Sequence, residues 1–393
     1  MGESERQSSE VETETEGGEE SADVESDPLE LFFDLVFVFA FTRVTAFVSH
    51  HHSWAGLIRG VALLAALWWA WVTYSWLMDT APTESVLSER VVVLTATALM
   101  FVAALAVPQA FGDTAVLFGV TYFVVRALHV GLSVRTTHGR ARRRFLGLVP
   151  GFLGGPALLA AAGFAGEPLR SGLWVAGIGV DYGALAIGGV AKFDVHVEHF
   201  VERYRGIVII ALGESILAMG FTVAETDPQL PLRIVVAAFL GIVYVAALGW
   251  LYFDYVTLAA EEYFVGLEEY ERGVVARNSY AYLHLPIIAG IIFVALGLEE
   301  TVAHVSEPLG PISAVALYGG TALYLLGQNA FRVFDVGSVS VLRLLVAGAV
   351  CLSIPLAADV PALLALVGLV VLAITLVAVE TLYSPLRRAV LED

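Results

Sequence analysis

The sequence predicts an all-α integral membrane protein with about twelve transmembrane helices. Of the 393 residues, 58% are hydrophobic and 15% are charged, and the mean hydropathy is +0.78. A soluble core of this size cannot bury so much apolar surface. Apolar runs of about eighteen residues or more recur along the chain, and about 20 residues cross a hydrocarbon core of roughly 30 Å. Each run is therefore a candidate span.

Twelve apolar stretches are separated by charged or turn-forming residues. We expect spans at 30–49, 54–78, 91–111, 114–134, 145–165, 169–190, 204–221, 231–256, 278–297, 310–327, 341–358 and 361–383.

The two ends of the chain are polar. Residues 1–29 contain eleven acids and a single base, Arg6, which is typical of a disordered acidic tail. This tail has neither the basic start nor the cleavage site of a secretory signal, so the first span should be retained. We expect a polytopic transmembrane domain at 30–385 and a short cytoplasmic tail at 386–393.

The positive-inside rule gives the orientation, because Lys and Arg concentrate in short cytoplasmic loops. With a cytoplasmic N-terminus, sixteen of the 21 basic residues fall in inner segments, and only Arg170 and Arg233 in outer ones. The largest inner group lies at 135–144. The sequence therefore predicts a multi-pass protein of the plasma membrane with both termini cytoplasmic.

Short similar strings recur in the two halves of the chain. Residues 30–38 align with 202–210, 66–69 with 247–250, and 117–121 with 317–321. The order is kept, which indicates two possible six-helix repeats at 30–190 and 199–385, an arrangement common in secondary transporters. The alternative is that short apolar strings match by chance.

Two of these strings also carry a family resemblance. Residues 30–40 read ELFFDLVFVFA, residues 202–215 read ERYRGIVIIALGES, and residues 250–254 read WLYFD. Over 28–383 the chain resembles the bacterial low temperature requirement protein A family. The resemblance implies a multi-pass membrane protein and supplies no catalytic residues, because the family name records a growth phenotype. The motif positions are Glu30, Asp34, Glu202, Arg203, Gly213 and Glu214.

Charged residues inside spans are the best candidates for function, because one near the bilayer centre costs roughly 2.5–3.5 kcal/mol. Glu214, Asp181 and Arg126 are predicted near the midplane. If they meet, one carboxylate lacks a fixed countercharge and can carry a proton or hold a cation. Gly213 would ease local unwinding there. The alternative is a static ion pair that joins helices.

A second group of acids is predicted at the cytoplasmic mouth. Glu30 and Asp34 share one helix face because they are four residues apart, while Glu202 and Asp254 fall at the inner ends of their spans. Together these acids would attract cations and repel anions. The alternative is that they stabilise helix ends, where the helix dipole favours negative charge.

The sequence predicts no metal site and no cofactor. The histidines are not arranged as the three ligands and open position of a zinc hydrolase, and no nucleotide-binding glycine motif occurs. With a net charge of −18, nucleic acid is not an expected partner. The expected partners are the lipid bilayer and a small solute, a proton or a cation.

The leading hypothesis is therefore a transporter- or channel-like protein for a small solute or cation. Its site would combine Glu214, Asp181 and Arg126 with Asp34 and Asp254 at the mouth. One alternative is a membrane enzyme that acts on a lipid or lipid-linked substrate at the cytoplasmic face, using Glu202, His199 and Asp254. Another is a structural or sensory membrane protein without transport.

Overall fold

The computed structural model describes residues 28–80, 86–188, 195–226, 229–254 and 256–384. Every regular element within these ranges is a helix, apart from one isolated bridge between Pro308 and Pro361. The all-α class is thus confirmed. The predicted acidic tail, up to residue 27, and the predicted C-terminal tail at 386–393 lie outside the described residues.

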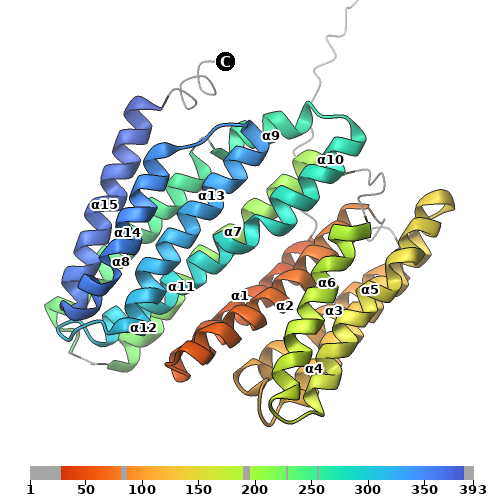
Figure 1. The fold of residues 1–393 in the computed structure, drawn as a ribbon, viewed down its shortest axis with the longest axis horizontal. Helices are drawn as coiled ribbons and strands as arrows, with labels where there is room; N and C mark the ends of the chain where they lie inside the picture. Colours follow the sequence, from red (N-terminus) through yellow and green to blue (C-terminus); the bar gives the residue numbers. More distant parts are fainter. Residues whose placement is uncertain (1–27, 81–85, 189–194, 227–228, 255, 385–393) are drawn as a thin grey trace, which may run out of the picture.

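The first six long helices form one group, coloured red to yellow-green in Figure 1. Helix α5 packs against both α4 and α6. A glycine allows this approach: a Cβ on Gly155 would lie 2.6 Å from the carbonyl oxygen of Gly177. The helices are α1 (Pro28–His50), α2 (Trp54–Thr80), α3 (Leu87–Ala106), α4 (Ala115–Thr136), α5 (Gly139–Gly163) and α6 (Leu169–Gly188).

The remaining helices form the second group, coloured green to blue in Figure 1. Two of its helix runs contain π-helical turns, at Ala276–Tyr282 before α11 and at Val315–Gly319 before α13. The helices are α7 (Val197–Thr226), α8 (Leu232–Phe253), α9 (Val256–Val265), α10 (Glu269–Val275), α11 (His284–Ala303), α12 (Pro311–Ala314), α13 (Gly320–Val336), α14 (Val341–Asp359) and α15 (Ala362–Tyr383).

Ten helices or helix runs in the described part of the chain are long and apolar enough to cross a membrane. They coincide with ten of the twelve predicted spans. The other two, at 169–190 and 310–327, overlap α6 and α12–α13, which are not among those ten. The chain is therefore a multi-pass membrane protein by helix length and composition, and the twelve-span count stays a prediction.

The two helix groups meet through α1 and α2 on one side and α7 and α11 on the other. The first turn of α1, the end of α2 and the start of α7 lie together, because His199 contacts both Glu30 and Asp79. The start of α14 and the end of α15 lie at the same end of the bundle (Figure 1). We call this end the termini side and the other the opposite side.

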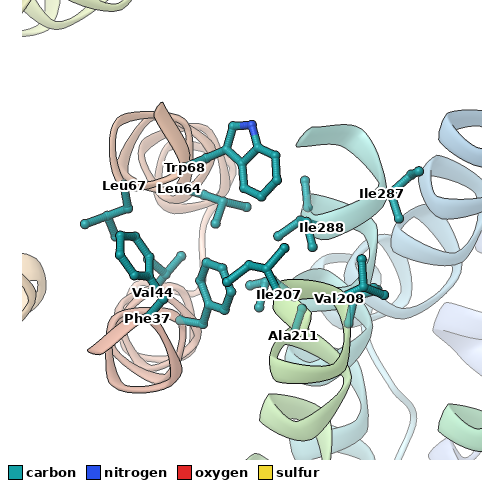
Figure 2. Close-up of a cluster of buried hydrophobic side chains, with 14 of the residues drawn as sticks. Phe37, Val44, Leu64, Leu67, Trp68, Ile207, Val208, Ala211, Ile287 and Ile288 are labelled. Atoms are coloured by element: carbon teal, nitrogen blue, oxygen red, sulfur yellow. The ribbon is translucent and has the colours of Figure 1, made fainter. Parts of the chain in front are cut away.

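An apolar layer fills the centre of the interface between the groups. Side chains from four helices point toward one another there (Figure 2), and we call this set the central apolar layer: Phe37, Leu64, Trp68, Ile207, Ala211 and Ile288. All six are at most 2% exposed. Inside a bilayer, close van der Waals packing of this kind holds helices together, because the lipid is as apolar as the side chains.

Candidate functional site

Helix α7 carries charges on both sides of the central apolar layer. On the termini side, Arg203 is buried against α1: its Nη2 lies 3.0 Å from Asp34 Oδ1, and its Nη1 lies 3.5 Å from Glu30 Oε1. Trp71 of α2 donates a hydrogen bond to the same Asp34 oxygen, at 2.8 Å. The guanidinium thus pairs with both acids that are four residues apart on α1.

His199 completes this group one turn before Arg203. Its Nε2 lies 2.8 Å from Glu30 Oε2, and its Nδ1 lies 3.3 Å from Asp79 Oδ1. Asp79 also accepts a hydrogen bond from the backbone N–H of His196, at 3.2 Å. We call the five residues the termini-side ion cluster: Glu30, Asp34, Asp79, His199 and Arg203. If His199 is protonated, the cluster contains two cations and three carboxylates.

The structure brings only part of the predicted acidic mouth together. Glu30 and Asp34 are buried and paired with cations, rather than open to solvent. The Glu202 side chain is 55% exposed and lies 4.0 Å from Arg205. Asp254 is half-buried directly after α8. Asp79 was not predicted, although it follows an apolar run in the last turn of α2.

Arg126 and Asp181 form a fully buried ion pair between α4 and α6. Arg126 Nη2 lies 2.7 Å from Asp181 Oδ1, and the Tyr122 hydroxyl donates to Asp181 Oδ2 at 3.0 Å. Arg126 also donates to Thr73 Oγ1 at 2.5 Å. Both members of the pair are at most 2% exposed. This is the geometry of the predicted static ion pair, and it lies within the first helix group.

Glu214 is separate from that pair and lies where α7 packs against α1. It is 0% exposed. Its Oε2 accepts a hydrogen bond of 2.5 Å from the Thr42 hydroxyl, and Thr45 lies beside it. Its Oε1 has no hydrogen-bond partner of ordinary geometry among the described residues, and none of the ion pairs found in that part of the chain includes it.

More carboxylates lie between Glu214 and the opposite side. Glu299 of α11 is close enough to Glu214 to interact electrostatically, and its Oε1 accepts a hydrogen bond from Ser49 at 3.2 Å. Glu300 lies 3.5 Å from His304. We call Glu299 and Glu300 the opposite-side acids. Sequence reasoning missed them because they come just after the expected span 278–297.

A second buried ion pair, also missed, joins α14 and α15. Arg343 Nε and Nη2 lie 2.9 Å and 2.7 Å from the two oxygens of Glu380. Arg343 also donates to the carbonyl oxygen of Leu251 at 3.0 Å. The signal was present in the sequence, because both charges fall inside apolar spans. This pair ties the last two helices to α8.

No group of three or more His, Cys, Asp or Glu side chains within the described ranges has an arrangement that could hold a metal ion. The ligand chemistry open to Glu214 is therefore that of a single carboxylate with neighbouring hydroxyl groups, rather than that of a multi-acid metal centre.

Comparison with known proteins identifies the family. Residues 25–378 match the family described as bacterial low temperature requirement A protein. The chain belongs to this low temperature requirement A family. An uncharacterized protein of Rhizobium meliloti (strain 1021) is 32% identical over 315 residues, which cover 76% of this chain and 75% of the relative. No solved structure matches the chain. The family match includes both α1 and α7, and thus Glu214 and the termini-side ion cluster.

Proposed function

We propose that this family member is transporter- or channel-like for a small solute or a cation, with Glu214 as the residue that binds a proton or the cation. The observation that carries the proposal is the environment of Glu214. It is a fully buried carboxylate at the interface between the two helix groups, hydrogen-bonded to a hydroxyl group instead of paired with a basic side chain. Buried ionisable groups in membranes usually mark ion or proton pathways.

The chemistry around Glu214 fits a hard, small cation or a proton. Carboxylate and hydroxyl oxygens are the ligands that such cations prefer, and Thr42 provides a hydroxyl at 2.5 Å. A bound proton or cation would neutralise a charge that otherwise remains buried without a counter-ion, which is costly. Reversible neutralisation of this kind is what a coupled carrier needs.

The surroundings support a pathway that is closed on one side. The opposite-side acids would attract cations toward Glu214. Toward the termini side, Phe37 lies between Asp34 and Thr42 along α1, and Ala211 lies between Arg203 and Glu214 along α7. Both side chains belong to the central apolar layer (Figure 2). From Asp34 to Thr42 the chain rises about 12 Å at about 1.5 Å per residue. An apolar constriction of this length would block ions until α1 and α7 shift.

Matching helix contacts in the two groups support the proposed six-helix repeats. Five contacts within the first group have counterparts in the second. In the first group they are α1–α2, α1–α3, α3–α4, α4–α5 and α5–α6. Their counterparts, in the same order, are α7–α8, α7–α11, α11–α13, α13–α14 and α14–α15. Extending the alignment of 30–38 with 202–210 makes Thr42 equivalent to Glu214, and these two residues contact each other. A contact between equivalent positions is expected close to the axis that relates two repeats.

The arginine distribution supports the proposed orientation. Arg140, Arg142, Arg143 and Arg144 lie in the first turns of α5, and Arg203 and Arg205 lie near the start of α7, all on the termini side. The positive-inside rule then puts this side, with both termini, in the cytoplasm of a plasma-membrane protein.

The lipid-enzyme alternative has less support from the geometry. His199 is bonded to Glu30 and Asp79, and Glu202 faces Arg205 at the surface. Neither is directed at a common reaction centre. Measuring flux distinguishes the proposal from a structural or sensory role without transport.

The test is flux through purified protein in liposomes, followed with lumenal pH and cation-sensitive dyes under imposed proton, sodium and potassium gradients. Wild type should show flux for at least one of these ions, and Glu214→Gln should abolish it. The matched control is Glu262→Gln, at an exposed position of α9. Wild type without flux for any of the three ions, or Glu214→Gln with wild-type flux, would overturn the proposal.

A further inference from the structure

A cavity lies within the first helix group, between α2, α4, α5 and α6. It contains about 570 Å³ of space, part of it open to the outside. No residue of α7 lines it, so it is separate from Glu214. The lining residues are Trp69, Val72, Thr73, Trp76, Leu77, Thr80, His129, Ser133, Thr136, Thr137, Phe145, Phe152 and Leu185.

Aromatic rings form much of the cavity wall. Trp69 and Trp76 face it from α2, and Phe145 and Phe152 face it from α5. Trp69 is held in place by a stacked contact with Tyr182, with 4.0 Å between ring centroids. Flat apolar surfaces of this kind pack well against an aromatic ring, in offset-stacked or edge-to-face geometry.

The hydroxyl groups of the wall are set to accept hydrogen bonds. Thr73 donates to the Ala70 carbonyl at 2.9 Å, Thr80 to the Trp76 carbonyl at 3.0 Å, and Thr136 to the Leu132 carbonyl at 3.1 Å. Since a hydroxyl has one proton and two lone pairs, each retains acceptor capacity. The cavity therefore favours a ligand that donates.

His129 adds a polar ring to the cavity wall. It is 5% exposed, and its Nε2 lies 3.4 Å from Ser133 Oγ. Its Nδ1 interacts with the backbone of Thr73, but without the ordinary geometry of a hydrogen bond to any described residue. The imidazole is thus held by long or poorly aligned hydrogen bonds, and since buried polar atoms are nearly always well bonded, a bound molecule with a hydrogen-bond donor would improve its bonding.

The ligand must be uncharged. The described residues that line the cavity include no Asp, Glu, Lys or Arg. Arg126 does not line the cavity; it donates to Thr73 Oγ1 and the Trp69 carbonyl behind the wall and is already paired with Asp181 at 2.7 Å. A charged ligand would be desolvated here without a counter-ion, which is costly.

We propose that this cavity is a binding site for small uncharged aromatic molecules that carry a hydroxyl or N–H donor, as phenols and indoles do. The rings would pack between the aromatic walls, and the donor would meet the threonine hydroxyls or His129. The site is separate from the proposed ion pathway, because no residue of α1 or α7 lines it.

The test measures binding of 4-fluorophenol by fluorine NMR to the full-length protein in lipid nanodiscs, with 4-fluoroanisole as the matched probe without a donor. Specific binding saturates, whereas partitioning into lipid does not. We expect saturable binding of the phenol, and binding of the anisole weaker by about fivefold or more, since one hydrogen bond is lost. No saturable binding, or equal binding of the two probes, would overturn the proposal.

Two variants locate the site. Ser133→Leu adds bulk to the cavity and should abolish saturable binding, whereas Ser353→Leu, whose hydroxyl bonds only within α14 among the described residues, should leave it unchanged. His129→Phe keeps a ring but removes the imidazole, and should reduce the preference for phenol over anisole. If both cavity variants bound the phenol like wild type, the site would lie elsewhere and the proposal would fail.

Discussion

The helix pair α1 and α7 contains two carboxylate sites that differ in their partners. On the termini side, Asp34 and Glu30 lie 3.0 Å and 3.5 Å from the guanidinium of Arg203. Beyond the central apolar layer, the carboxylate of Glu214 has a hydroxyl partner, Thr42. Burial is nearly equal, at 5% exposure or less for all three acids. Burial alone therefore does not separate a structural acid from a candidate transport acid, whereas the nature of the partner does.

The difference between the two carboxylate sites has an energetic reason. A buried ion pair repays its desolvation only while both partners are present, so removing either one is destabilising. A carboxylate with hydroxyl partners can instead be neutralised by a proton or a cation, without loss of a fixed contact. The ion cluster should therefore respond to mutation in stability, and Glu214 should respond in function.

The largest effect is expected for Arg203→Met. This change leaves Glu30 and Asp34 buried without their guanidinium, and should lower the free energy of unfolding by about 3–5 kcal/mol. Thermal unfolding in detergent would measure it. The control is Arg205→Met, whose partner Glu261 lies at 2.8 Å with both side chains at least 20% exposed, and which should cost about 1 kcal/mol or less. Equal destabilisation by the two variants would contradict the assigned role of Arg203.

The Arg126–Asp181 pair should show strong coupling of the same type. Arg126→Met and Asp181→Asn should each lower the free energy of unfolding. The double variant should lose about 1–3 kcal/mol less than the sum of the two single losses. A double-mutant cycle of unfolding free energies measures this coupling. Strict additivity would show that the 2.7 Å contact contributes nothing.

A smaller change is expected for Thr42→Val, which removes the hydroxyl bonded to Glu214. The loss of one hydrogen bond to a charged group should cost about 1.5–3 kcal/mol if Glu214 is ionised, and about 1 kcal/mol if it is protonated. Thermal unfolding at a series of pH values distinguishes these cases. Thr95→Val is the control, because that hydroxyl bonds within its own exposed helix turn. No difference between the two variants would contradict a hydrogen bond to Glu214.

The smallest change in stability is expected for Glu214→Gln, within about 1 kcal/mol, because the amide keeps an oxygen that can accept from Thr42. This variant sharpens the comparison with Arg203→Met, since its main effect should be on flux. Unfolding and liposome flux should be measured on the same preparation. A large loss of stability with unchanged flux would reverse the roles assigned to the two sites.

Part of the candidate site follows from sequence patterns. Glu30 and Asp34, four residues apart in a helix, had to share a face, and Glu214 was singled out because it is a charge inside an apolar span; its depth in the bilayer stays a prediction. The assignment of partners was less complete. Asp181 and Arg126 do meet, whereas Glu214 contacts α1. The pair Arg343–Glu380 was not predicted. Asp254 was grouped with Asp34, whose bonds are with Arg203 and Trp71.

The sequence by itself determined the helical membrane class, the positions of the apolar stretches and the family. The bilayer makes this possible, because each span must be long, apolar and internally hydrogen-bonded wherever it lies in the chain. Only the tertiary structure decided which charge meets which partner. His199 and Glu30 are 169 positions apart, yet their side-chain atoms lie 2.8 Å from each other. Contacts at this range depend on how whole helices pack, and local periodicity has no information about that packing.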